Sequence, residues 1–152
     1  MKFPGSRDFR RFRGNRRGQS LVEFSLAAPL LLITATGMVA FGLALYDQIV
    51  LANGVNAGAQ TLALSRGQTT DPCATASTAI ENASPSLSTS KLSFKFIING
   101  TSYTSTSCTA GAANMVQGAT VQVTANYPCV LAVYGLNATS CGLGAQTSEM
   151  IQ

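Results

Sequence analysis

FSLAAPLLLITATGMVAFGLALY, residues 24–46, is an unbroken run of uncharged residues bounded by Glu23 and Asp47. A helix needs about 20 residues to cross a hydrocarbon core about 30 Å thick. A chain of 152 residues is too small to bury so long an apolar helix on every side. The run therefore predicts one membrane-spanning helix.

The positive charge of the chain is concentrated before this run. Every Lys and Arg except Arg66, Lys91 and Lys95 precedes residue 18. Asp8 is the single acidic residue in that segment. A basic tail is able to bind nucleic acid or lipid headgroups. Directly before an apolar helix, however, basic residues mark its cytoplasmic end. We therefore expect no nucleic-acid partner.

A helical pattern continues beyond the apolar run. The Gly- and Arg-rich leader up to Gly18 has no periodicity, so we expect it to be disordered. From there one helix is predicted to extend over residues 20 to 65, followed by Gly67 in the left-handed conformation that closes helices. Its part outside the membrane has an apolar stripe spaced by three and four residues, which must pack against the following chain. The stripe comprises Ile49, Ala52, Val55, Ala59 and Leu62.

The remaining chain predicts a short helix and a small sheet. Asp71-Pro72 is a helix start, with an N-cap carboxylate before proline at the first helical position. Asn99-Gly100 is a favoured two-residue hairpin turn, and it would place Phe96 opposite Tyr103. A second alternating strand over 119–127 is expected to end at Pro128. The segment 142–151 predicts a weak last strand.

All the cysteines follow the apolar run, at Cys73, Cys108, Cys129 and Cys141. They form no CxxC motif and the chain has no histidine, so we predict disulfides in an oxidising compartment and no metal site. Three pairings are possible. We favour Cys73–Cys108 and Cys129–Cys141, because the second closes a short, turn-rich loop that contributes about 3 kcal/mol in the chain-entropy description.

The sequence offers no catalytic constellation. Without histidine there is no Ser-His or Cys-His pair, and the acids are scattered. No Gly-rich loop follows a strand in a phosphate-binding context. We therefore predict no catalytic residues, no enzyme activity, no cofactor and no small-molecule substrate.

The junction RRGQSLVEF, residues 16–24, resembles the processing signature of type IV pilin-like precursors. A basic leader ends in Gly18, and Glu23 follows five residues later at the head of an apolar helix. Residues 16–66 are similar to the TadE/TadG-like minor pilins or pseudopilins of tight-adherence (Tad) pilus systems. The resemblance implies that prepilin peptidase cuts the Gly18–Gln19 bond on the cytoplasmic side. It also implies that the helix is kept as an assembly domain.

Two roles are open for Glu23. In pilin-like assemblies, the resemblance implies, this glutamate pairs with the new amine of a neighbouring subunit, and the attraction is strong at low dielectric. Alternatively, Glu23 is a capping carboxylate near the helix start, favoured by the helix dipole and by Arg16 and Arg17. These two arginines are also expected to hold the leader in the cytoplasm.

The expected fold is α+β and type IV pilin-like: a long N-terminal transmembrane and assembly helix, a short second helix and a small antiparallel sheet with disulfides. The expected parts are a leader (1–18), the helix (19–66) and an extracytoplasmic domain (67–152). The expected location is the bacterial inner membrane, with one pass and a cytoplasmic N-terminus. Prepilin peptidase, other pilins and the pilus assembly machinery are the expected partners.

Two other functions are compatible with the residues. A secreted small disulfide domain would be cut near Gly42-Leu43-Ala44, although the apolar segment is longer than the usual 7 to 15 residues of a signal peptide. A membrane-tethered envelope binding protein would use the Ser- and Thr-rich sheet, in which no residue marks a binding site.

Overall fold

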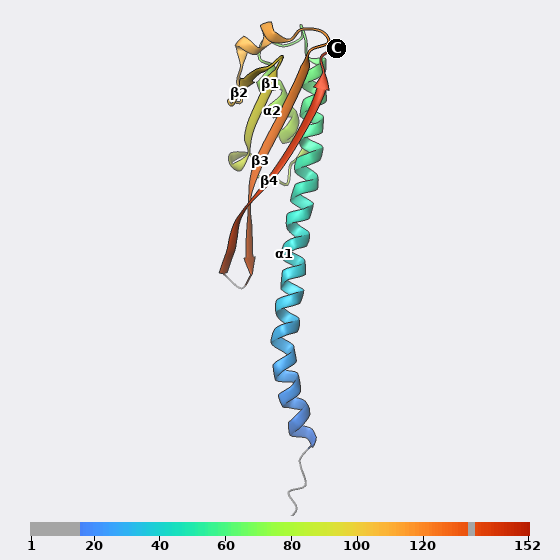
Figure 1. Cartoon of the computed structure of the whole chain (residues 1–152), viewed down its shortest axis with the longest axis vertical. Helices are drawn as coiled ribbons and strands as arrows, with labels where there is room; N and C mark the ends of the chain where they lie inside the picture. The colour runs from blue at the N-terminus through green and yellow to red at the C-terminus, as the bar shows by residue number, and fades with distance from the viewer. Residues whose placement is uncertain (1–15, 134–135) are drawn as a thin grey trace, which may run out of the picture. The chain divides into compact units, whose positions relative to one another are not determined.

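The structure is a computed structural model that describes residues 16–133 and 136–152 (Figure 1). The chain divides into two compact parts, residues 1–36 and 37–152. Helix α1 (Arg16–Leu64) runs from the first part into the second. The predicted leader lies outside the described residues up to residue 15. Because α1 begins at Arg16, the last three residues of that leader are helical.

The buried stripe of α1 differs from the predicted one at its first position. Val55, Ala59 and Leu62 are fully buried, as expected, but Ile49 is 60% exposed and the stripe begins at Leu51. Ile49 was therefore wrongly placed in the core. At 3.6 residues per turn, Ile49 lies about 160° around the helix from Leu51, so the two cannot face the same neighbour. The helix is followed by Gly67 at φ 71°, as predicted.

Helix α2 (Pro72–Ala83) begins at the predicted residue. Asp71 accepts a hydrogen bond from the backbone N–H of Ala74 at 3.1 Å, which is the N-cap interaction that an aspartate before Pro72 predicts. The helix ends at Ala83, and the buried hydroxyl of the C-cap residue Ser84 donates to the carbonyl of Ile80 at 2.6 Å.

The strands form one antiparallel sheet in the order β2-β1-β3-β4. Two short 3-10 helices precede β1 and β3. The bounds are η1 (Thr89–Lys91), β1 (Ser93–Ile98), β2 (Thr101–Tyr103), η2 (Thr109–Asn114), β3 (Thr120–Val133) and β4 (Leu136–Met150). The predicted hairpin is confirmed: Phe96 lies opposite Tyr103, and Asn99 and Gly100 have φ of 48° and 80°. Both central residues of this turn type need positive φ, which Asn-Gly supplies.

Strand β3 continues through Pro128, so the prediction that Pro128 ends it is wrong. The pairing of β1 with β3 stops at Ser93 and Asn126, before the proline is reached. Beyond that point β3 pairs only with β4, where Pro128 lies opposite Gly142. Beyond Asn126, β3 is an edge strand with one unpaired side. Proline is tolerated in such a strand, because it lacks the N–H that would donate to a neighbouring strand. The weak last strand predicted at 142–151 is part of β4, which begins at Leu136.

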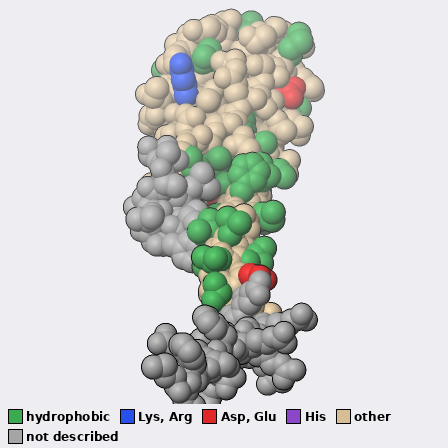
Figure 2. Space-filling model, turned by 60° about the horizontal axis from the view of Figure 1, so that its bottom comes forward, with side chains coloured by type: hydrophobic (Ala, Val, Ile, Leu, Met, Phe, Trp, Pro, Cys, Tyr) green, Lys and Arg blue, Asp and Glu red, His purple; other side chains and the backbone are tan. Residues whose placement is uncertain are grey.

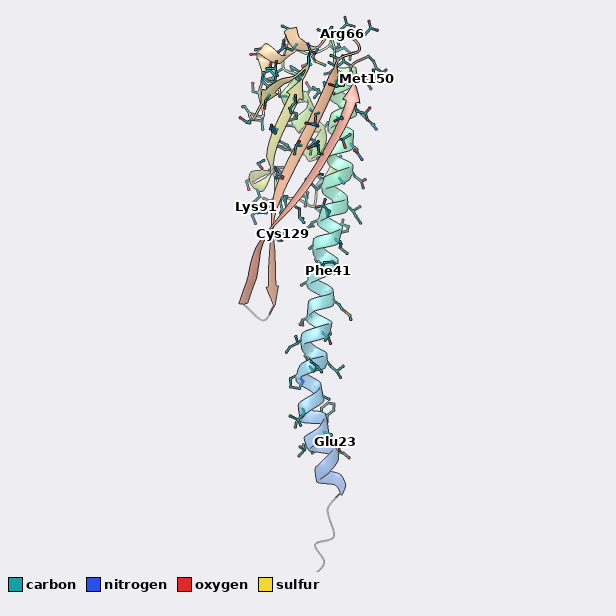
Figure 3. All side chains as sticks on the ribbon, in the orientation of Figure 1. Glu23, Phe41, Arg66, Lys91, Cys129 and Met150 are labelled. Carbon is teal, nitrogen blue, oxygen red and sulfur yellow. A yellow bond between two sulfur atoms is a disulfide. The ribbon has the colours of Figure 1, made fainter. Side chains whose placement is uncertain are left out.

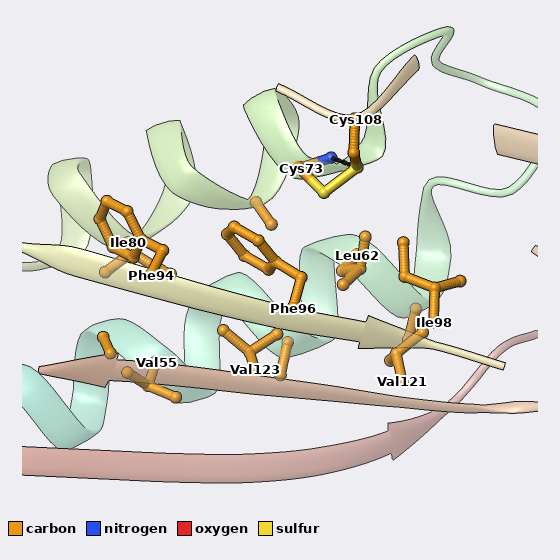
Figure 4. Close-up of a cluster of buried hydrophobic side chains, with 14 of the residues drawn as sticks. Val55, Leu62, Cys73, Ile80, Phe94, Phe96, Ile98, Cys108, Val121 and Val123 are labelled. Atoms are coloured by element: carbon orange, nitrogen blue, oxygen red, sulfur yellow. Dashed lines mark hydrogen bonds between the residues drawn. A yellow bond between two sulfur atoms is a disulfide. The ribbon is translucent and has the colours of Figure 1, made fainter. Parts of the chain in front are cut away.

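One face of the sheet packs against α1 and α2 (Figure 4). Phe96 is fully buried at the centre, and its ring stacks with that of Phe94 at a centroid distance of 6.0 Å. The core residues alternate along β1 and β3, as the period of two requires. The fully buried large side chains are Phe96, Leu51, Leu62, Ile80, Ile98, Val55, Val121 and Val123. The helix stripe therefore covers the apolar face of the sheet.

The fold class is α+β, as predicted. It comprises a long apolar N-terminal helix, a short second helix and a four-stranded antiparallel sheet, with two cysteine pairs at disulfide distance. The predicted division at residues 18 and 66 remains a prediction. In the structure, α1 residues between Leu51 and Ala63 belong to the same core as the sheet.

Candidate functional site

Helix α1 exposes apolar side chains along the uncharged run. Among the described residues, it is the one helix long and apolar enough to cross a membrane, with a mean hydropathy of 2.0. Leu26 is 74% exposed in the first part of the chain, and Met38 is 75% exposed in the second. Figure 2 shows hydrophobic side chains gathered on the helix. Such an exposed apolar surface is suited to lipid, and it fits a single-pass membrane anchor.

Three hydroxyl side chains in and beside the apolar run donate to carbonyls of the same helix. Ser25 donates to the carbonyl of Val22 at 2.8 Å, Thr34 to Leu31 at 2.9 Å, and Thr36 to Leu32 at 2.8 Å. In lipid, where no water is present, an unsatisfied polar group costs several kcal/mol. These bonds within the helix allow Ser and Thr to lie in a membrane span without partners from elsewhere.

The charged end of α1 carries the residues expected for processing and assembly. The backbones of Arg16, Arg17, Gly18 and Gln19 form its first turn. Glu23 is exposed one turn further on. Because residues four apart share a helix face, Glu23 lies on the same side as Gln19, about 6 Å along the axis. Cleavage after Gly18, the topology role of the arginines and the pairing of Glu23 remain predictions.

The cysteines lie at disulfide distance in the two pairings that the sequence favoured. Cys73 at the start of α2 is bonded to Cys108 before η2, with a Cα–Cα distance of 5.3 Å, and both side chains are buried. Cys129 of β3 is bonded to the directly opposite Cys141 of β4, at 5.1 Å. The first pair joins the second helix to the loop that follows the hairpin, and the second links β3 and β4.

A hydrogen-bond network around Asp71 adjoins the buried disulfide. Besides capping α2, Asp71 accepts hydrogen bonds from the Cys108 backbone N–H at 2.8 Å and from the Ser107 hydroxyl. Burial opposes ionisation, but the hydrogen bonds from Ser107 and from the backbone of Cys108, Ala74 and Cys73 outweigh it. They lower the pKa of Asp71 below its ordinary value of 3.8. The sequence predicted the cap but not the second half of this network.

Polar contacts of α1 with β4 and with Gln152 just after it were not visible in the sequence. Gln48 donates to the carbonyl of Gly144 at 2.9 Å, Thr147 donates to Asn56, and the Gln152 backbone N–H donates to the carbonyl of Ala63 at 3.2 Å. These contacts place β4 alongside the second half of α1. No local pattern predicts them, because the partners are about 90 residues apart.

In the described part of the chain, the two best-formed surface hollows are lined by no acid–base pair. One, of about 350 Å³, lies beside the end of α1 and is lined by hydroxyl, amide and aliphatic side chains: Thr61, Leu64, Ser65, Gln68, Thr69 and Thr75. Within residues 16–133 and 136–152, no three Cys, Asp or Glu side chains gather as a metal site requires. The features that stand out are therefore the apolar helix and its charged end.

A family match found by comparison with known proteins falls on this helix. No curated protein and no solved structure matches the chain. Residues 18–60 match the family described as TadE-like protein. The match begins at the predicted processing site and ends within the part of α1 that packs on the sheet. The chain therefore carries a TadE-like segment at residues 18–60, which confirms the resemblance seen in the sequence and supports involvement in Tad pilus systems.

Proposed function

We propose that this protein is a minor pilin or pseudopilin of a Tad pilus, a structural and assembly subunit anchored in the bacterial inner membrane. The observation that carries this proposal is the TadE-like match, which covers Gly18, Glu23 and the apolar run together. TadE-like proteins are structural components of the pilus rather than an enzyme family. The apolar surface of α1 supports anchoring, with the N-terminus cytoplasmic and the sheet extracytoplasmic.

Processing would convert the precursor into an assembly subunit. Prepilin peptidase would hydrolyse the Gly18–Gln19 bond, leaving a positive amine on Gln19 at the cytoplasmic edge of the membrane. Glu23 of one subunit would then pair with this amine of a neighbour and set the axial register of the packed helices. The pairing supports assembly because the attraction between opposite charges is stronger near hydrocarbon than in water.

The partners follow from this role. Prepilin peptidase would act first, and other pilins or pseudopilins and the assembly machinery would then receive the helix. The TadE-like match implies membership of this machinery. No nucleic acid, small molecule or cofactor enters the proposal.

The secreted-domain alternative places the cut elsewhere. Cleavage near Ala44 would leave the buried stripe from Leu51 to Leu62 in the domain, so a folded product remains possible. The TadE-like match, however, extends across this position from residue 18 to residue 60. A segment that matches one family on both sides of the cut supports a helix kept whole.

Intact mass spectrometry of the membrane-extracted protein tests the proposal. The protein should be produced in cells that contain the whole pilus system, so that the peptidase is present. A mature chain beginning at Gln19 is expected. A chain beginning near Leu45 would indicate secretion. An uncut N-terminus would indicate that α1 serves only as a membrane anchor. Co-purification of other pilins from the same extract tests the assembly role separately.

A further inference from the structure

The part of α1 that follows the apolar run has an exposed side as well as a buried one. Ile49, Asn53, Gln60 and Leu64 are exposed, and they are here called the outer face. At about 100° per residue they fall within about 60° of one another around the helix, over about 22 Å of its length. Leu62, which is fully buried, lies about 160° around the helix from Gln60. The outer face is therefore turned away from the core.

The neighbouring elements border the outer face without covering it. Asn56 lies at its edge, where its Oδ1 accepts a hydrogen bond from Thr147 of β4. Helix α2 packs on the opposite side of α1, where a methyl group on Gly54 or Gly58 would meet Ile80. Figure 3 shows side chains of this part of α1 projecting away from the strands. In the described part of the chain, the outer face thus remains open to another molecule.

The chemistry of the outer face is suited to a surface identical to itself. No charged residue occurs between Asp47 and Arg66, although Lys and Glu are the usual residues of an exposed helix face. The middle of the outer face consists of the amides of Asn53 and Gln60. An amide side chain both donates and accepts hydrogen bonds, so it can bond to the same side chain of another copy, which Lys and Glu cannot do.

Membrane anchoring would bring such identical surfaces together. Two copies anchored by the same apolar run have parallel helices at the same height, so each outer-face residue lies level with its own equivalent. A charge on such a contact would face a like charge and oppose association, and the outer face has none. Asn53, Asn56 and Gln60 are spaced by three and four residues, as in the seam of a parallel two-stranded coiled coil, where a polar Asn fixes the register.

We propose that the outer face of α1 binds the outer face of a second copy of this chain, which forms a parallel, twofold-symmetric pair of helices on the extracytoplasmic side. The contact is isologous, with the same patch on both copies. Asn53 and Gln60 each bond to their equivalents, and Ile49 and Leu64 supply apolar contacts at the two ends. This inference rests on the membrane anchoring in the proposed function. It adds a self-association outside the bilayer.

Cross-linking between single added cysteines tests the proposal. The native cysteines are all bonded in pairs, so a bismaleimide reacts only with an added thiol. Asn53→Cys and Gln60→Cys lie on the outer face. Thr78→Cys is the control, because Thr78 is exposed on α2, which packs on the other side of α1. Each full-length variant is produced at a low level in cells, and the isolated membranes are treated with a short bismaleimide.

Both outer-face variants should give a covalent dimer of this chain, with a yield several-fold above that of Thr78→Cys. Equal yields at the three positions would show random collision or no association, and they would overturn the proposal. A cross-link from the outer face to a different protein in place of the dimer would overturn it as well. If the variants are recovered in the soluble fraction, the membrane anchoring in the proposed function also fails.

Charge variants test the contact itself. In the Gln60→Cys background, Asn53→Lys places two ammonium groups opposite each other and should lower the dimer yield several-fold. Producing Asn53→Lys together with Asn53→Glu should restore the dimer, because each charge then faces its opposite. Because Asn53 is exposed, neither substitution should change the thermal unfolding of the protein.

Two outcomes of the charge test contradict the proposal. A dimer that persists in Asn53→Lys would show that another surface, such as the apolar run, holds the copies together. A mixture of Asn53→Lys and Asn53→Glu that yields no more dimer than Asn53→Lys alone would show that residue 53 does not face its own equivalent.

Discussion

A methyl group added to Gly58 of α1 would lie 2.4 Å from Cγ1 of Ile80 in α2, closer than real side chains approach. Its other close neighbour is the backbone carbonyl of Ala76, at 3.1 Å. Gly58 therefore allows α2 to pack directly on the backbone of α1. A glycine within a helix costs about 1 kcal/mol relative to alanine, so its benefit here comes from tertiary packing.

Gly58→Ala should consequently destabilise the domain, although alanine is the better helix former. Ile80 would have to move within a packed core, at a cost of about 1 to 3 kcal/mol. Thermal unfolding of the full-length protein in detergent measures the effect. Gly42→Ala is the matched control, because nothing lies within 4 Å of a methyl group there, and it should not lower the melting temperature. Ile80→Ala should partly rescue Gly58→Ala, and strictly additive losses would contradict the packing explanation.

Asp71→Ala should lower stability by about 1 to 2 kcal/mol, because it removes an N-cap. It also removes the acceptor for Ser107 and Cys108. Thr78→Ala is a suitable control, because the exposed Thr78 hydroxyl donates to the Ala74 carbonyl within the same helix and its loss leaves the cap intact. Chemical denaturation of both variants at neutral pH measures the difference. If both variants lose the same free energy of unfolding, the hydrogen bonds to Asp71 contribute no more than an exposed bond within the helix.

The Asp71 network should also make stability depend on pH in the acid range. Hydrogen bonds lower the pKa of Asp71 in the folded state, so the unfolded chain binds the proton more readily. The contribution is therefore fully present above the unfolded pKa of about 3.9 and is lost as the pH falls through the folded pKa. Wild type should lose more stability than Asp71→Asn between neutral pH and pH values below about 4. Parallel curves for the two proteins would contradict this.

The two disulfides should differ in their effect on stability. Their sequence separations are 35 and 12 residues, which correspond to about 4 and 3 kcal/mol in the chain-entropy description. Cys73–Cys108 is also buried in the core, so replacing both residues by serine would leave polar groups there. We expect that pair of substitutions to unfold the domain at physiological temperature. The Cys129→Ser/Cys141→Ser protein should remain folded. Limited proteolysis and circular dichroism separate the two results.

Gly18→Leu should block the proposed processing, and Glu23→Ala should leave it intact. The first substitution puts a bulky side chain at the scissile bond, and the second removes a charge that acts only after the cut. Glu23→Ala should insert normally but lose co-purifying pilins and pilus output. Glu23→Asp keeps the charge and should retain part of the function. Unaltered mature size in Gly18→Leu would refute the cleavage site, and normal assembly in Glu23→Ala would leave Glu23 with its capping role.

Local patterns predicted much of this fold. The uncharged run, the Asp71-Pro72 helix start and the Asn99-Gly100 turn each combine a residue type with its own backbone requirement, so a few neighbouring residues are sufficient evidence. The TadE-like match likewise depends on a contiguous segment, residues 18–60. The processing and pairing residues at its start were read from sequence alone, and they remain to be tested.

Tertiary structure decided the features that depend on distant partners. Ile49 and Leu51 are equally apolar, and only the position of the sheet determines that Leu51 is buried. Pro128 can lie within β3 only because the pairing of β3 with β1 stops before it, at Asn126. That limit is set by β1, which lies at least thirty residues earlier in the chain. Gly58 is unfavourable in a helix by itself, and its benefit comes only from the close packing of Ile80 against it. The sequence by itself thus determined most of the elements and the apolar character of α1, because these follow from short-range periodicity and charge. Which faces meet was decided by packing, because burial is a property of two surfaces and not of one.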